Sequence, residues 1–290
     1  MTNERPRRSA LFLPASNQRA IDKASTLDCD VVIFDLEDAV APDEKPKARQ
    51  LACAAIAARN FERHELVLRI NGAGTSWFDE DFRSALSVAP DAILLPKVED
   101  PELVGATASV LQASAGVSRT KLWCMLETPL GVLSSAMIAQ AHPRLECLVM
   151  GTSDLTKDLR AQHTQSRLPL LMSLELCLLA ARAYGKCILD GVCLELSNDD
   201  AFRDACLQAK ALGFDGKTLI HPKQVATCNS VFSPSDAEVA QAQAIIAAHA
   251  AAKAGGRGVA VHDGRLVEEL HVQEAERTLA LDRAVRPPRG

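Results

Sequence analysis

The stretch KLWCMLETPLG, residues 121–131, decides the fold class of this chain. An apolar run typical of a buried strand ends in a polar side chain, and a proline suited to a helix start follows at once. The segments ELVLRIN (65–71) and LECLVMGTSDL (145–155) have the same design. Polar side chains at the C-terminal ends of different strands are typical of a (β/α)₈ barrel. The side chains concerned are Arg69, Glu127 and Asp154.

Eight apolar segments of this kind alternate with helical stretches, which is the pattern of a parallel sheet. Most are continuous apolar runs, as expected of strands that are buried on both faces. We therefore predict an α/β fold, a (β/α)₈ TIM barrel that occupies residues 1–232. The predicted strands are 9–15, 30–38, 66–71, 92–99, 122–128, 147–153, 187–192 and 216–222.

The composition changes after the eighth strand. Residues 233–254 are rich in alanine and predict a long helix that ends at a Gly-Gly pair. A hairpin is predicted around Asp263, followed by an amphipathic helix. Because residues 233–290 have few hydrophobic side chains for a core of their own, we expect them to pack across a subunit boundary as a lid. The apolar residues assigned to that last helix are Val267, Leu270, Ala275 and Leu279.

The composition also limits the class of protein. The formal net charge of the 290 residues is -5, and there are 8 Phe, 2 Trp and 1 Tyr, which argues against nucleic-acid binding. No apolar run approaches the ~20 residues that span a bilayer. The N-terminal apolar run stops at Pro14, too early for a signal-peptide core of about 7–15 residues. We expect a cytoplasmic protein that binds neither nucleic acid nor membranes.

Nine cysteines are present, but none forms a Cys-x-x-Cys pair. Several lie inside or beside apolar runs, where cysteine packs as a small hydrophobic residue. Free buried thiols are therefore expected in preference to disulfides or a zinc site.

Two carboxylates and a guanidinium that converge at the strand ends would form a site for a metal and a small anionic substrate. Mg²⁺ usually takes only one or two protein carboxylates, so Glu127 and Asp154 would suffice with two substrate oxygens. Arg69 would bind a substrate carboxylate through paired N–H donors. Each carboxylate could instead stabilise a helix N-terminus, and Arg69 could pair with Glu37 or Asp38.

Seven segments, in this order and spacing, resemble the HpcH/HpaI aldolase and citrate lyase β-subunit family, in particular its CitE-like branch. The resemblance covers nearly the whole chain. It implies a (β/α)₈ barrel, a Mg²⁺ ion, an acyl-CoA and a 2-oxo acid as small-molecule partners, and a homo-oligomer, commonly a homotrimer. The segments are RSALFLPAS, FDLEDAVAPDEKPKAR, RINGAGTSWFDED, LPKVE, ETPLGV, GTSDL and GFDGKTLIHPKQV.

The activity implied by this resemblance is that of a Mg²⁺-dependent carbon–carbon lyase on a 3-hydroxy-3-carboxyacyl-CoA such as malyl-, citramalyl- or citryl-CoA. Such a cleavage leaves an enolate, so the enzyme must place positive charge beside it. The resemblance implies metal ligation by Glu127 and Asp154. It also implies substrate binding by Arg69, Glu127, Gly151 and Thr152, and an ordering role around the metal for Glu37, Asp38 and Lys97.

For several cations and one histidine, the sequence is consistent with either a functional or a structural role. Lys97 could favour an anionic substrate or pair with Glu99 or with a ligand carboxylate. His221 is expected to be a hydrogen-bonded structural residue near the barrel rim rather than a general base. Four further cations could bind the phosphates of coenzyme A or could form a solvated charged surface. These cations are Arg8, Lys45, Lys47 and Arg49.

The C-terminal extension contains the main departure from the family. Many thioester-cleaving relatives have an aspartate after a hairpin glycine, which acts as acid or base in the active site of a neighbouring subunit. The segment GRLVEELH has Glu268 at that position, and Asp263 is a conceivable substitute. Glu268 is therefore counted with Arg69, Glu127 and Asp154 as a candidate catalytic residue. A class II-type aldolase on a free 2-oxo acid and an aldehyde, and a non-catalytic citrate lyase subunit, remain alternatives.

Overall fold

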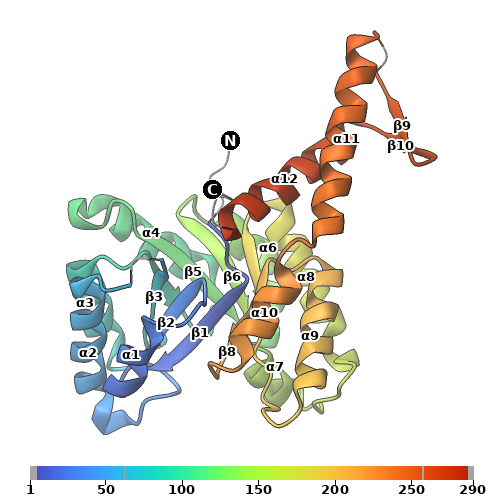
Figure 1. Ribbon diagram of the computed structural model, residues 1–290. Helices are drawn as coiled ribbons and strands as arrows, with labels where there is room; N and C mark the ends of the chain where they lie inside the picture. Colours follow the sequence, from blue (N-terminus) through green and yellow to red (C-terminus); the bar gives the residue numbers. More distant parts are fainter. Residues whose placement is uncertain (1–4, 62, 257, 287–290) are drawn as a thin grey trace. The chain divides into compact units, whose positions relative to one another are not determined.

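Eight parallel strands close into a barrel in the computed structural model, which describes residues 5–61, 63–256 and 258–286 (Figure 1). Each strand pairs with the next along the chain, and β8 pairs with β1. The predicted (β/α)₈ barrel and its eight strands are confirmed. The strands are β1 (Ser9–Pro14), β2 (Val31–Asp35), β3 (Glu65–Arg69), β4 (Ala92–Leu95), β5 (Lys121–Leu126), β6 (Leu145–Met150), β7 (Cys187–Asp190) and β8 (Gly216–Leu219).

Helices follow the strands and surround the barrel (Figure 1). N-cap side chains stabilise the starts of several helices. Thr128 accepts a hydrogen bond from the Gly131 N–H, and Asn198 accepts one from the Ala201 N–H. The helices are α1 (Gln18–Ala24), α2 (Lys45–Ala58), α3 (Phe78–Val88), α4 (Pro101–Ala113), α5 (Pro129–Leu133), α6 (Ser135–Gln140), α7 (Thr152–Asp158), α8 (Leu171–Ala183), α9 (Asp199–Leu212) and α10 (Gln224–Phe232). Short 3₁₀ turns are η1 (Pro42–Glu44), η2 (Ala115–Val117) and η3 (Leu168–Leu170).

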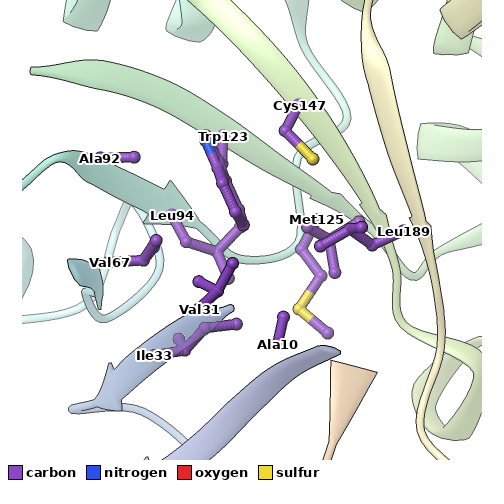
Figure 2. Close-up of a cluster of buried hydrophobic side chains, with 11 residues drawn as sticks. Ala10, Val31, Ile33, Val67, Ala92, Leu94, Trp123, Met125, Cys147 and Leu189 are labelled. Atoms are coloured by element: carbon purple, nitrogen blue, oxygen red, sulfur yellow. The ribbon is translucent and has the colours of Figure 1, made fainter. Parts of the chain in front are cut away.

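An apolar layer fills the barrel interior, with Trp123 fully buried among its members (Figure 2). Side chains alternate between the two faces of a strand, so residues two apart point the same way. Ile33, Val67 and Met125 belong to the interior cluster. By the same alternation Asp35, Arg69 and Glu127, each two residues later, are directed toward the barrel axis above that layer. The strand register therefore positions the polar groups of the site.

The C-terminal helices and hairpin form a compact unit separate from the barrel unit Arg7–Asn229; its described residues run from Ser230 to Arg286 and include Arg5 and Pro6. Asp263 and Gly264 adopt positive φ angles of 49° and 72°, as a tight hairpin turn requires. The predicted helix, hairpin and second helix are present. The elements are α11 (Asp236–Ala254), β9 (Ala260–His262), β10 (Arg265–Val267) and α12 (Glu269–Val285).

Two details of the sequence analysis are wrong for this unit. It has a small hydrophobic cluster of its own, in which Val267 and Val272 are buried with Ala252 and Ala260. Val267 lies in β10 rather than in the helix, and Leu270 is 58% exposed. Val267 is the buried residue of β10, and its apolar side chain had been counted with the helix that starts two residues later.

All nine cysteines lie in the described part of the chain and are free thiols, as expected. Six are buried, including Cys124 and Cys147 in the barrel wall, while Cys187 and Cys193 are only partly buried. Among the described helices, none is both long and apolar enough to cross a bilayer.

Candidate active site

Glu127 and Asp154 meet at the C-terminal end of the barrel through Lys97. Glu127 follows β5 and is 2% exposed, and its Oε1 accepts a hydrogen bond of 2.8 Å from the Lys97 N–H. Asp154 lies in the first turn of α7, and its Oδ2 is 3.3 Å from Lys97 Nζ. The structure therefore brings the two predicted carboxylates to the same lysine. Asp154 also lies where a helix favours negative charge, so both interpretations of this residue fit its position.

Gly151 makes room for the Glu127 carboxylate. A Cβ atom built on Gly151 would lie 2.4 Å from Glu127 Oε2 and 2.3 Å from its Cβ, distances that only glycine avoids. Thr152, the next residue, is buried, and its side chain in turn requires Gly191, where a Cβ would lie 2.4 Å from Thr152 Oγ1. The GTSDL segment thus shapes the space around Glu127.

Arg69 is held by Asp35, a residue that the sequence analysis did not single out. Arg69 Nε and Nη2 donate to the two Asp35 oxygens at 2.7 and 2.6 Å. Asp35 also accepts hydrogen bonds from the backbone N–H groups of Glu37 and Ala39. The expected partners Glu37 and Asp38 are secondary, at 3.0 and 3.6 Å from Nη1. The sequence analysis assigned a pair of Arg69 N–H donors to a substrate carboxylate, but Nε and Nη2 bind Asp35 instead. Nη1 is the nitrogen that faces the other acids of the site.

Lys97 links acids from three parts of the chain. Its Nζ is 2.5 Å from Glu37 Oε1 and 3.7 Å from Asp38 Oδ1, in addition to its contact with Asp154. These partners replace the ion pair with Glu99 that was one of its expected alternatives. Burial disfavours the charged ammonium, but the neighbouring carboxylates outweigh burial and raise the pKa of Lys97.

The charges of this site do not balance. Burial raises the pKa of Glu127 to about 7 and also raises the pKa of Glu37, despite the nearby cations. Five carboxylates face two cations, and counting the adjacent buried Lys45 ammonium still leaves negative charge in excess. We call this group the rim cluster. Its members are Asp35, Glu37, Asp38, Arg69, Lys97, Glu127 and Asp154.

A divalent cation fits the rim cluster. Hard carboxylate oxygens are the ligands that Mg²⁺ prefers, and an added cation would offset the negative excess. No cage of three or more His, Cys, Asp or Glu side chains is preformed within residues 5–61, 63–256 and 258–286. Mg²⁺ usually keeps water and substrate oxygens beside one or two protein carboxylates, a number that Glu127 and Asp154 supply.

A pocket of about 360 Å³ lies beside the rim cluster. Its lining includes Glu37, Asp38 and Lys97 of the cluster, and the loop that starts at Gly72 and runs through Thr75. This loop follows β3 and borders the pocket. Its neighbour Trp77 lines the same space.

Three of the four cations considered for coenzyme A are buried and are held by other groups of the barrel unit. Arg8 precedes β1, at the opposite end of the strands, and its guanidinium and backbone N–H together donate three hydrogen bonds to Asp30. Arg49 is buried and donates to Asp81 at 2.6 Å. Lys45 is buried and donates to two backbone carbonyls and to Asn71. Lys47 is the exposed member of the four, and it pairs with Glu44 at 3.0 Å.

His221 has the local structural contact that was expected of it. It lies after β8, and its Nδ1 accepts a hydrogen bond from the Lys223 N–H at 3.1 Å. This hydrogen bond holds the imidazole within the turn that leads into α10.

The two carboxylates considered as lid acids belong to the C-terminal unit. Glu268 is exposed at the start of α12, and its N–H donates to His271 Nδ1 at 3.0 Å. Asp263 occupies the hairpin turn, where its Oδ2 is 3.4 Å from His262 Nε2. Asp263 belongs to the turn and Glu268 is the N-cap residue of α12, so both residues have a local role in the C-terminal unit.

Comparisons with known proteins extend over nearly the whole chain. The family model described as HpcH/HpaI aldolase/citrate lyase matches residues 8–222. A (3S)-malyl-CoA thioesterase of Cereibacter sphaeroides is 45% identical over 280 residues, which cover 97% of this chain and 96% of that protein. An L-malyl-CoA/beta-methylmalyl-CoA lyase of the same species is 35% identical, covering 94% of this chain and 93% of that protein. The solved structure of protein CitE from Mycobacterium tuberculosis, in complex with magnesium, acetoacetate and coenzyme A, aligns with a TM-score of 0.78 at 28% identity, covering 97% of this chain and 99% of that one.

Proposed function

The chain belongs to the HpcH/HpaI aldolase/citrate lyase family, and we propose that it is a Mg²⁺-dependent enzyme acting on a 3-hydroxy-3-carboxyacyl-CoA, with malyl-CoA as the simplest such substrate. The observation that carries this proposal is the rim cluster, in which Glu127 and Asp154 converge on Lys97 within an excess of negative charge. A cation held there would bind the hydroxyl and carboxylate oxygens of a 2-hydroxy acid.

Glu127 and Asp154 would hold the metal, which supplies positive charge beside the oxygen that becomes negative during bond cleavage. Arg69, held rigidly by Asp35, would direct Nη1 at the substrate carboxylate and keep the breaking bond in alignment. Gly151 would keep the space at Glu127 open, and the pocket beside Lys97 would receive the acyl portion.

The bond that breaks is proposed to be the carbon–carbon bond between the acyl-CoA and 2-oxo acid fragments. The enolate left on the acyl-CoA must then receive a proton, for which a carboxylic acid is suited. Hydrolysis of the thioester is the second candidate, because the relative with 45% identity is a malyl-CoA thioesterase. In that reaction water attacks the thioester carbonyl, and the products are coenzyme A and a hydroxydicarboxylic acid.

One incubation separates the two reactions. The purified full chain is mixed with Mg²⁺ and malyl-CoA, and free thiol and 2-oxo acid are measured in the same sample. Release of 2-oxo acid without thiol indicates carbon–carbon cleavage, and release of thiol without 2-oxo acid indicates hydrolysis. Neither product with any of malyl-, citramalyl- or citryl-CoA would contradict the proposal and favour a non-catalytic subunit. Condensation of a free 2-oxo acid with an aldehyde would favour the aldolase alternative.

Glu268 is proposed as the acid that the C-terminal unit supplies to the active site of a neighbouring subunit. Its exposure leaves the carboxyl group accessible, although glutamate places it one methylene farther out than the aspartate of many relatives. Glu268→Gln should therefore lower turnover by about 10²–10⁴-fold and leave Mg²⁺ binding unchanged. Glu269→Gln, at the next exposed glutamate, is the matched control and should remain active.

Mixing two inactive variants tests the donation between subunits. If Glu268 serves a neighbour, mixed oligomers of Glu127→Gln and Glu268→Gln contain some sites with both intact residues and regain part of the activity. No recovery after verified subunit exchange, or a monomer by light scattering, would exclude this arrangement. Full activity of Glu268→Gln alone would remove its acid role.

A further inference from the structure

Lys97 occupies the position among the rim acids where a bound cation is most needed. Its ammonium lies 2.5 Å from Glu37 and 3.3 Å from Asp154, and Asp38 is 3.7 Å away. Its side chain is still 43% exposed, so the ammonium can leave this position without crossing packed protein. The acids that Lys97 contacts include one of the two proposed metal ligands.

The backbone of Lys97 is constrained separately from its side chain. Its φ angle of 49° is in the left-handed region, which a residue with a Cβ rarely adopts. This conformation accompanies the hydrogen bond from its N–H to Glu127 Oε1. Lys97 therefore orients one proposed metal ligand through its backbone and neutralises the other through its ammonium. Only the second of these contacts conflicts with a bound metal ion.

We propose that the Lys97 ammonium is a built-in counter-ion of the rim acids, and that Mg²⁺ and this ammonium exclude each other at Asp154. The released ammonium then turns into the adjoining pocket, which it already lines, and binds an anionic group of the substrate. This inference rests on the proposed metal site. It makes binding ordered, because the metal must enter before the lysine is free to contact the substrate.

Mg²⁺ titration by calorimetry, without substrate, tests the competition. Lys97→Met removes the competing charge and should bind Mg²⁺ at least about tenfold more tightly than the wild type. Lys157→Met is the matched control: Lys157 is an exposed lysine of α7, three residues after Asp154, and its ammonium lies 3.9 Å from Asp158. This control should bind Mg²⁺ with nearly wild-type affinity. Equal or weaker binding by Lys97→Met would overturn the proposal.

Amine labelling of the wild-type protein tests the movement without any substitution. The rate at which an amine-reactive reagent modifies Lys97, followed by peptide mass spectrometry, should rise when Mg²⁺ is added. The rate at Lys157 should not change. An unchanged rate at Lys97, with Mg²⁺ shown to be bound, would overturn the exchange and leave the metal site intact. Absence of Mg²⁺ binding by both the wild type and Lys97→Met would instead remove the metal site and this inference with it.

Discussion

Two buried ionic clusters of the barrel unit differ in their balance of charge. In the barrel wall, Asp190 is fully buried at the end of β7 and contacts two cations, Lys217 at 2.5 Å and Arg167 at 2.7 Å. Burial would raise the pKa of Asp190, but the two cations outweigh burial and lower it. In the rim cluster, acids outnumber cations and the pKa of Glu127 is raised to about 7. A buried acid with enough cationic partners stabilises the fold, whereas an excess of buried acids indicates a site that needs a cation.

The largest effect is expected from removing the rim carboxylates. Glu127→Gln and Asp154→Asn should each lower Mg²⁺-dependent turnover by about a thousandfold or more, because a bound metal supplies several kcal/mol of charge stabilisation. Circular dichroism and the urea unfolding midpoint should stay close to those of the wild type. Wild-type turnover in both variants would mean that the rim cluster is not the reaction site.

Substitution in the wall cluster, formed by Asp190, Lys217 and Arg167, should lower stability rather than Mg²⁺ binding. Asp190→Asn leaves Lys217 and Arg167 without their shared counter-charge and should reduce the free energy of unfolding by about 3–5 kcal/mol. Urea denaturation gives this value directly. The folded fraction of the variant should still bind Mg²⁺ normally. A stability loss below 1 kcal/mol would show that the two clusters differ less than their charge balance indicates.

A smaller effect on catalysis is expected at Arg69. Arg69→Lys keeps the charge but loses the two parallel hydrogen bonds to Asp35, so turnover should fall about a hundredfold through misalignment. Asp35→Asn should lose part of the same alignment, and the double variant should lose less than the two single losses combined. Steady-state kinetics of the four proteins measures this coupling. Additive losses would separate Asp35 from the function of Arg69.

The smallest effect is a pH dependence of stability. The pKa of folded Asp190 lies below the ordinary value of about 3.9, so its ion pairs contribute fully above that pH. Their contribution should disappear as the pH falls from about 4 through the lower folded pKa. The difference in free energy of unfolding between the wild type and Asp190→Asn should therefore shrink below pH 4. A constant difference down to pH 2 would contradict the lowered pKa.

The barrel could be predicted because its strands are continuous apolar runs, each followed by polar residues. The predicted ends were less accurate: the segment 30–38 corresponds to β2 (Val31–Asp35), and 92–99 corresponds to β4 (Ala92–Leu95). The residues beyond these ends belong to the loops that carry the site. Strand alternation also contained a signal for Asp35, which lies two residues after the interior Ile33. Glu37 and Asp38, the predicted partners of Arg69, follow the strand and make the longer contacts, at 3.0 and 3.6 Å.

Other features of the site depend on contacts that the sequence does not encode locally. Lys97 has a positive φ angle, which its own sequence does not indicate. Its ammonium contacts Asp154, a residue far from it in the chain. The structural role of Arg8 was easier to predict from the sequence, because a residue before β1 lies at the end of the barrel away from the site. The role proposed for Glu268 in a neighbouring subunit stays a prediction.

Calorimetric titration of Mg²⁺ into the wild type, Asp154→Asn and Asp190→Asn tests the contrast between the two clusters most directly. The account predicts one site in the wild type, strongly weakened binding in Asp154→Asn, and wild-type affinity in Asp190→Asn at a temperature where that variant is folded. Equal Mg²⁺ affinity in the wild type and Asp154→Asn, or loss of binding in folded Asp190→Asn, would contradict the assignment of the rim cluster as the metal site.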